Sequence, residues 1–170
     1  ASRSFGLLLV IDLGAAPVPD DAVGEGAVLR VQHLVGRQPR VALLLLAALA
    51  IAAVAHATHA QEPNWFTTAP VGATQKALAK AGWSVKDVDL WEVNEAFAVV
   101  PMALMHDLKV SHDIVNVNGG ACALGHPIGA SGARIMVTLI HALQARGKRR
   151  GLATLCIGGG EATSVTLELL

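Results

Sequence analysis

The sequence has 170 residues, 53% of them hydrophobic and 15% charged, a composition that excludes a chain disordered over its whole length. The formal net charge is zero and the basic residues are scattered apart from Lys148–Arg150, so no electrostatic feature predicts a nucleic-acid partner. Two cysteines do not make a disulfide framework, and they favour a reducing, cytoplasmic location.

Residues 1–55 differ in composition from the rest. They contain no lysine, and the run from Val41 to Ala55 is entirely apolar. The run is shorter than the ~20 residues of a membrane span, so we expect no membrane association. It resembles the apolar part of a signal peptide but starts too far into the chain. We favour a buried helix or strand–helix segment, with secretory processing near Ala55 or Ala60 and a misread or spliced segment as alternatives.

The pattern becomes regular from residue 56. Pro70 suits the first turn of a helix over 71–81, which Gly82 ends. A strand is expected over 89–93, followed by a helix over 95–108 that Pro101 should bend.

The second half continues the alternation. We expect a strand over 114–117, then a glycine-rich loop, then a helix over 131–145 capped by Ser131. Two strands, 151–157 and 163–169, flank a turn of three glycines. Alternating helices and strands predict a layered α/β domain with a mixed sheet over 56–170.

Two side chains stand out as candidates for chemistry. His126 lies among glycines that expose the backbone, where a neutral imidazole could deprotonate a thiol or stabilise an oxyanion. Cys156 ends a strand before the triple glycine, a place where catalytic side chains are often presented. By residue type alone, a structural histidine and a small buried cysteine are the commoner roles.

Two further residues complete the candidate site. Asn94 lies where a strand meets a helix, and its side chain could either cap that helix or help to form an oxyanion hole. The amide of Gly158 could donate to an oxyanion at Cys156. We expect no metal site, because Cys122, His126 and Cys156 lack the spacing of zinc ligands.

Three motifs together resemble the C-terminal domain of thiolases, the family of acetyl-CoA acetyltransferases and 3-ketoacyl-CoA thiolases. The motifs are Asn94-Glu95-Ala96, Asn118-Gly119-Gly120 to Gly125-His126-Pro127, and Cys156-Ile157-Gly158-Gly159-Gly160. The resemblance implies a thiolase-like layered domain, with helices covering both faces of its mixed sheet.

The resemblance also implies roles for the candidate residues. His126 would activate the acyl-accepting cysteine, and Asn94 would hold a water in the same oxyanion hole. Cys156 would exchange a proton with the α-carbon of an acyl-CoA, and the amide of Gly158 would serve a second oxyanion hole. The substrates would be acetyl-CoA and other acyl-CoA thioesters, with no resident cofactor, and the complete enzyme would be a homo-oligomer.

The sequence departs from the family in one respect. Thiolases form an acyl-enzyme on a cysteine of their N-terminal half, whereas Cys122 and Cys156 both fall inside C-terminal motifs. We therefore expect the C-terminal half of an enzyme that makes or cleaves acetoacetyl-CoA, inactive alone. The alternatives are a non-catalytic CoA-binding or interaction module and a ketosynthase-like enzyme, although ketosynthases use a second histidine where this chain has Cys156.

Overall fold

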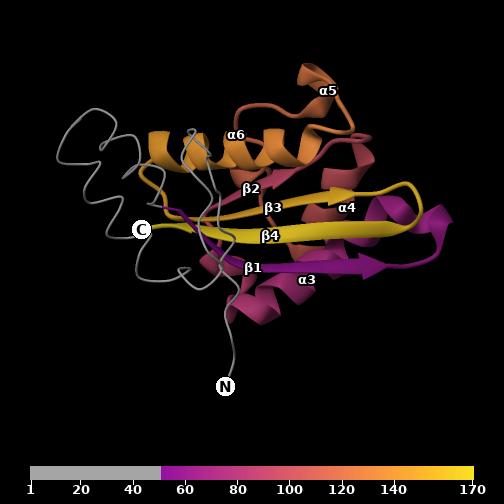
Figure 1. The fold of residues 1–170 in the computed structure, drawn as a ribbon, viewed down its shortest axis with the longest axis horizontal. Coiled ribbons are helices and arrows are strands. Elements are labelled where there is room, and N and C mark those ends of the chain that lie inside the picture. Colours follow the sequence, from indigo (N-terminus) through magenta and orange to yellow (C-terminus); the bar gives the residue numbers. More distant parts are fainter. Residues whose placement is uncertain (1–50) are drawn as a thin grey trace, which may run out of the picture. The chain divides into compact units, whose positions relative to one another are not determined.

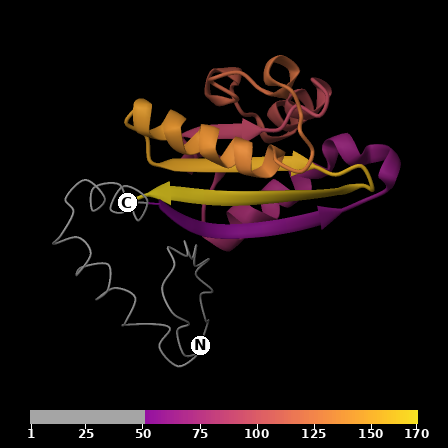
Figure 2. The ribbon, with the colours of Figure 1, turned by 45° about the horizontal axis from the view of Figure 1, so that its top comes forward.

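A computed structural model describes residues 51–170, which form one mixed four-stranded sheet with helices packed against it (Figure 1). Along the sheet the strand order is β1-β4-β3-β2. Strand β2 pairs with β3 in parallel, and β3 pairs with β4 antiparallel. In Figure 2, β1 and β4 run in opposite directions. The strands are β1 (Ile51–Ala60), β2 (Leu90–Val93), β3 (Arg150–Cys156) and β4 (Glu161–Leu169).

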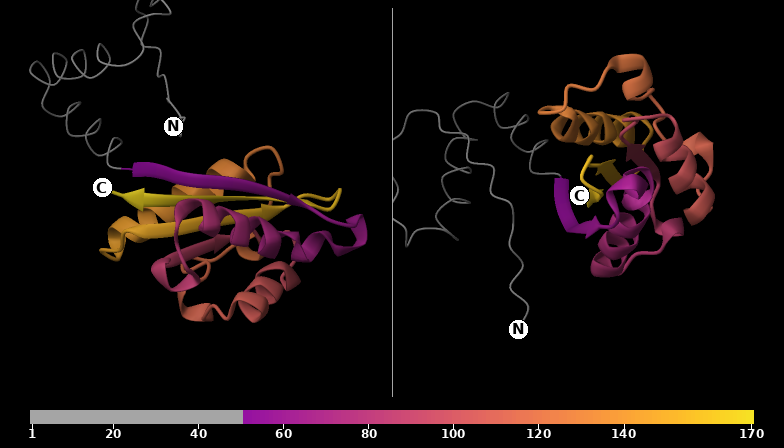
Figure 3. Two further views of the ribbon diagram at one scale, coloured as in Figure 1. Left: turned by 90° about the horizontal axis from the view of Figure 1, so that it is seen from below. Right: turned by 90° about the vertical axis from the view of Figure 1, so that its right-hand side faces the viewer.

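Helices cover both faces of this sheet, as expected. On one face, Gly151 of β3 leaves space that Leu139 of helix α6 fills. On the other face, the next residue, Leu152, belongs to a core cluster with Leu104 of α4 and Leu78 of α3. Figure 3 shows α6 on one side of the sheet and α3 on the other. The helices are α3 (Ala69–Ala81), α4 (Val99–Leu108), α5 (Ala121–Leu124) and α6 (Ser131–Ala145), with 3-10 turns η1 (Pro63–Thr68), η2 (Val85–Asp87) and η3 (His112–Ile114).

Helix α3 forms as its sequence predicts. Pro70 lies in its first turn, where a missing N–H leaves no hydrogen bond unmade, and Gly82 ends it in the left-handed conformation with φ 68°. The small residues Ala69 and Ala73 pack directly against Ala162 of β4. Small side chains at these positions let the helix approach the sheet closely.

The expected helix over 95–108 was wrong at its start. Helix α4 begins at Val99, so Pro101 lies within its first turn rather than in its interior. First-turn amides have no partner inside the helix, and the proline therefore breaks no hydrogen bond there.

The expected strand over 114–117 was also wrong. The 3-10 turn η3 occupies residues up to Ile114, and only Val115 forms a β-bridge, to Trp91. Asn116 then takes a left-handed conformation with φ 48°, which ends the extended backbone.

Strand β1 runs through the expected boundary at residue 55, so residues 51–55 lie within the sheet. The remainder of the N-terminal segment, including 41–50 of the apolar run, lies outside the described residues, and its atypical character stays a prediction. Within 51–170, no helix is long and apolar enough to cross a bilayer.

Candidate active site

Two of the predicted site residues lie at neighbouring strand ends. Asn94 directly follows β2, and its backbone N–H donates a hydrogen bond to the backbone carbonyl of Thr154 in β3 over 2.9 Å. Cys156 ends β3 two residues further on. Because β2 and β3 are parallel, both residues lie at the carboxyl edge of the sheet, the edge where α/β proteins commonly bind ligands. Both are buried.

Asn94 does not cap a helix, which was one of the two roles that its position allowed. The helix that it was expected to cap begins only at Val99. Its side-chain Nδ2 lies instead 3.4 Å from Nε2 of His126. The structure thus brings together two residues that are 32 positions apart in the sequence, at the mouth of the glycine-rich loop.

Ser131 orients His126 rather than capping helix α6, whose N-cap position belongs to Ala130. The Ser131 hydroxyl donates to the carbonyl of Pro127 at 3.1 Å and lies 2.6 Å from Nδ1 of His126. With the single hydroxyl proton of Ser131 directed to Pro127, the proton shared between Ser131 and the imidazole is assigned to Nδ1. The lone pair of Nε2 then faces the Asn94 amide, and this tautomer can accept a proton at Nε2.

Glu95 holds the start of the glycine-rich loop. Its carboxylate accepts hydrogen bonds from the amide of Cys122 and from Nδ2 of Asn116, each at 2.9 Å. The absence of a Cβ at Gly120 leaves room for the Glu95 carboxyl group, which a Cβ at that position would displace. Burial raises the pKa of Glu95, but these hydrogen bonds outweigh it and leave the pKa below its usual value.

Asn116 joins this loop to the edge of the sheet. Its side-chain Oδ1 accepts from the amide of Val93, and its Nδ2 donates to the carbonyl of Val93, both at 2.8 Å. The side chain thereby replaces a neighbouring strand at the point where β2 ends. Neither Glu95 nor Asn116 was among the residues predicted to form the site, although Glu95 belongs to one of the motifs and Asn116 lies two residues before another.

Glu92 and Arg134 form an ion pair next to Asn94. Oε2 of Glu92 is 3.6 Å from Nη1 of Arg134, and the Glu92 side chain is only 1% exposed. Burial raises the pKa of Glu92 to about 7, and the nearby Arg134 offsets this only in part. Nη2 of the same guanidinium donates to Oδ1 of Asn94 at 3.5 Å. This pair could not be predicted from the sequence, because residues of β2 and α6 come together only in the folded chain.

Cys156 and Gly158 occupy different environments. The thiol of Cys156 belongs to the hydrophobic cluster that also contains Val93 and Val100, and burial raises its pKa. Gly158 lies exposed in the turn between β3 and β4, and a Cβ there would meet only open space. Its amide makes no hydrogen bond to another residue of 51–170, so it is free to donate to a ligand.

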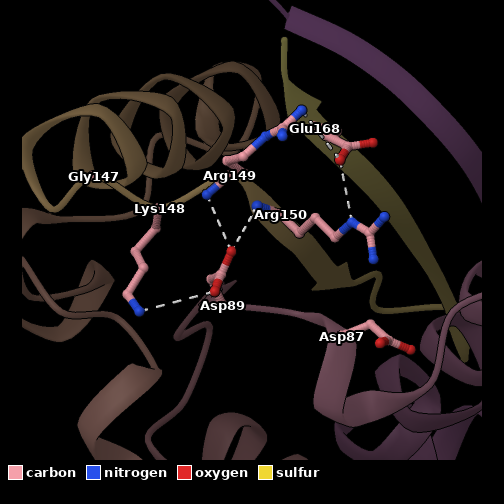
Figure 4. A pocket seen from close by; sticks show the side chains of 7 residues that line it. All are labelled: Asp87, Asp89, Gly147, Lys148, Arg149, Arg150 and Glu168. Carbon is pink, nitrogen blue, oxygen red and sulfur yellow. Dashed lines mark hydrogen bonds and ion pairs between the residues drawn. The ribbon is translucent and has the colours of Figure 1, made fainter.

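A surface hollow of about 480 Å³ lies away from these residues (Figure 4). Its cations are paired with carboxylates: Lys148 with Asp89 at 4.0 Å, and Arg150 with Glu168 at 3.2 Å. Asp89 also accepts the backbone amides of Arg149 and Arg150. The charges therefore balance, and nothing here favours an anion. Among the described residues, no cluster of three or more metal-binding side chains is present.

A mixed sheet with helices on both faces defines a layered α/β domain, and an imidazole, an amide and a thiol lie at or near the carboxyl edge of that sheet. Residues 46–169 match the family described as "Thiolase, C-terminal domain". The chain belongs to the thiolase family.

Known relatives agree with this assignment. An acetyl-CoA acetyltransferase of Chromobacterium violaceum is 57% identical over 107 residues, which are 63% of this chain and 27% of that protein. A cytosolic acetyl-CoA acetyltransferase of Mus musculus is 51% identical over the same shares of the two chains. The crystal structure of Acat5 thiolase from Ascaris suum, in complex with coenzyme A, superimposes with a TM-score of 0.67 at 44% identity, covering 71% of this chain and 31% of that one. The chain thus spans about 30% of the length of the relatives that it matches.

Proposed function

We propose that this chain provides the C-terminal domain of an acetyl-CoA acetyltransferase, which condenses two acetyl-CoA molecules or cleaves acetoacetyl-CoA. The observation that carries the proposal is the orientation of His126, whose unprotonated Nε2 faces Asn94 beside the strand end that bears Cys156. Family membership supports the proposal, and so does the relatives' activity as their names describe it.

His126 and Asn94 act first on the acyl-accepting cysteine that the family resemblance implies. The lone pair of Nε2 takes the proton of that thiol, and the thiolate attacks the thioester carbonyl of acetyl-CoA. The Cys156 thiol protonates the leaving sulfur, so CoA departs as its thiol while the acetyl group transfers to the enzyme, and Cys156 is left as the thiolate. The imidazole now carries N–H bonds at both nitrogens, so Nε2 can donate to a developing oxyanion together with a water held by Asn94.

Cys156 and Gly158 act in the second half of the reaction. The Cys156 thiolate removes a proton from the methyl carbon of a second acetyl-CoA, and the resulting enolate attacks the acetyl-enzyme carbonyl. The carbon–sulfur bond to the enzyme then breaks, which releases acetoacetyl-CoA and the first thiolate. The free amide of Gly158 supports the tetrahedral oxyanion of this step.

The remaining parts of the proposal concern the whole protein. Its substrates are CoA thioesters, it needs no resident cofactor, and it works as a cytoplasmic homo-oligomer in lipid metabolism. The cytosolic relative and the relative crystallised with coenzyme A support the location and the substrate class.

The test is thiolytic cleavage of acetoacetyl-CoA, followed by thioester absorbance. The isolated chain should be inactive, because its two cysteines, Cys122 and Cys156, both lie in C-terminal motifs and neither is the acyl-accepting cysteine of the family. A chimera that joins residues 52–170 to the N-terminal part of the Chromobacterium violaceum relative should be active. Cys156→Ser in the chimera should lower the rate by roughly 10²–10⁴-fold, the usual contribution of a general acid–base group.

Two results would overturn this proposal. One is a folded chimera that binds acetoacetyl-CoA but does not cleave it, which would favour a non-catalytic CoA-binding module. The other is full activity of the isolated chain that survives Cys156→Ser. Cys122→Ser is the matched control, since it changes the other thiol and should leave the rate within a few-fold of the parent.

A further inference from the structure

The proposed reaction leaves one buried charged pair without a role. Glu92 and Asn94 are two positions apart along β2, so their side chains project from the same face of the sheet. That face is covered by α6, which carries Arg134 in its first turn. The Glu92 carboxylate, the Asn94 amide and the Arg134 guanidinium therefore lie together, and Asn94 links them to His126.

The guanidinium contacts both side chains of this strand face. Nη1 of Arg134 is 3.6 Å from Oε2 of Glu92, while Nη2 is 3.5 Å from Oδ1 of Asn94. A planar guanidinium holds its nitrogens in a fixed fork, so fixing one nitrogen against Glu92 also fixes the other. The position of Oδ1 determines where the second end of the amide points, and Nδ2 faces Nε2 of His126.

We propose that Arg134, anchored by Glu92, is a positioning residue: it holds the amide oxygen of Asn94 and so turns the amide NH₂ toward Nε2 of His126. This inference rests on the proposed function, because it explains how His126 keeps the tautomer that the first proton transfer needs. Neither Glu92 nor Arg134 touches the reacting atoms in this scheme.

The energetics of the pair argue against a purely stabilising purpose. Both carboxylate oxygens of Glu92 lack a hydrogen-bond partner within residues 51–170, as do Nε and Nη1 of Arg134. A buried ion pair without supporting hydrogen bonds stabilises a fold poorly. The raised pKa of Glu92 points the same way, because burial disfavours its charged form. A buried ionisable group whose pKa is perturbed in this way is characteristic of functional sites.

The opposite amide orientation gives the proposal a clear readout. If the Asn94 amide were reversed, its NH₂ would face the guanidinium, where two groups of donors would oppose each other. Oδ1 would then face His126 and accept a hydrogen bond from Nε2–H, which favours the other tautomer of the imidazole. The protonated ring nitrogen of His126 therefore reports the orientation of Asn94.

The experiment measures the ¹⁵N chemical shifts of the His126 ring in the labelled 170-residue chain, in alkaline solution where the imidazole is neutral. The signals are assigned by their loss in His126→Gln. Wild type should show Nδ1 protonated and Nε2 unprotonated. Arg134→Met should move the tautomer ratio toward Nε2–H by roughly tenfold, the effect of one lost hydrogen bond.

The matched control is Arg146→Met, which removes an exposed arginine at the other end of α6 and should leave both shifts unchanged. Glu92→Gln keeps the side-chain shape and should move the ratio in the same direction as Arg134→Met. In the double variant it should add nothing further, since Glu92 acts through Arg134.

The proposal is overturned if Arg134→Met folds and shows the wild-type shifts, or if wild type already carries its proton on Nε2. A variant that fails to fold is identified by circular dichroism, and Glu92→Gln then carries the same test. Enzymatic activity does not enter these measurements. Wild-type shifts in folded Arg134→Met overturn the positioning role alone and leave the acetyltransferase proposal standing, whereas a proton on Nε2 in wild type removes the observation on which both rest.

Discussion

The buried carboxyl group of Glu92 makes the stability of this domain depend on pH in a predictable direction. Its pKa is raised from 4.5 to about 7 in the folded chain, with burial as the main cause. Between those two values the folded state binds a proton that the unfolded state has already released. The free energy of unfolding must therefore fall as pH rises through this window.

The magnitude follows from the difference between the two pKa values. Each factor of ten in proton affinity is worth about 1.4 kcal/mol, so the contribution of Glu92 amounts to about 3 kcal/mol. It is fully present below pH 4.5 and is lost once pH exceeds about 7. Glu92→Gln keeps the shape of the side chain and removes the titration.

The assay is urea unfolding of wild type and Glu92→Gln at both ends of this pH window. Other titrating groups are common to the two proteins, so they cancel in the difference. That difference should shift by about 3 kcal/mol in favour of the variant as pH rises. Glu161→Gln, at an exposed position of β4, is the control and should show no such shift. If the two stability curves run parallel, Glu92 does not titrate in this window and the reasoning fails.

Three further changes have definite expected outcomes. Gly160→Ala should lower the free energy of unfolding by more than ~1–3 kcal/mol in urea titrations, because φ is 99° there and a Cβ would overlap the backbone of Gln61. Leu104→Ala, at a fully buried position of α4, should cost ~2–5 kcal/mol in the same assay, whereas Met102→Ala on the exposed side of α4 should cost far less. The pKa of Cys122 is raised by desolvation and by the hydrogen bond and charge of Glu95, so Glu95→Gln should lower that pKa. Faster reaction of Cys122 with a thiol reagent at neutral pH checks this, and an unchanged rate would contradict it.

Much of the fold could be predicted from residues whose effect on the backbone is local. Pro70 and Gly82 bound helix α3 because each acts through its own backbone conformation, which needs no distant partner. The triple glycine between β3 and β4 is recognisable for the same reason, with Gly160 in the left-handed region. The resemblance of the motifs to thiolases then indicated the class of site before any contact was known.

The errors share one physical origin. Asn94 and Ser131 are good helix caps by residue type, yet each binds His126 instead. Asn116 ends an expected strand because its side chain pairs with Val93, which is 23 positions away. Polar side chains satisfy whichever partner the tertiary fold brings near, so their hydrogen bonds cannot be read from neighbouring residues alone.

The strand order β1-β4-β3-β2 has a consequence for synthesis of the chain. Strand β1 is made first among the four, but its neighbour β4 is made last, and the backbone N–H of Ala55 donates to the Thr166 hydroxyl across 111 positions. At typical translation rates of ~5–20 residues per second, several seconds pass between the synthesis of β1 and the synthesis of its neighbour β4. Helix α3 also packs on β4, so its apolar face lacks this partner until β4 has been synthesised. The edge of β1 and the face of α3 that packs on β4 therefore stay without their native partner until β4 has left the ribosome.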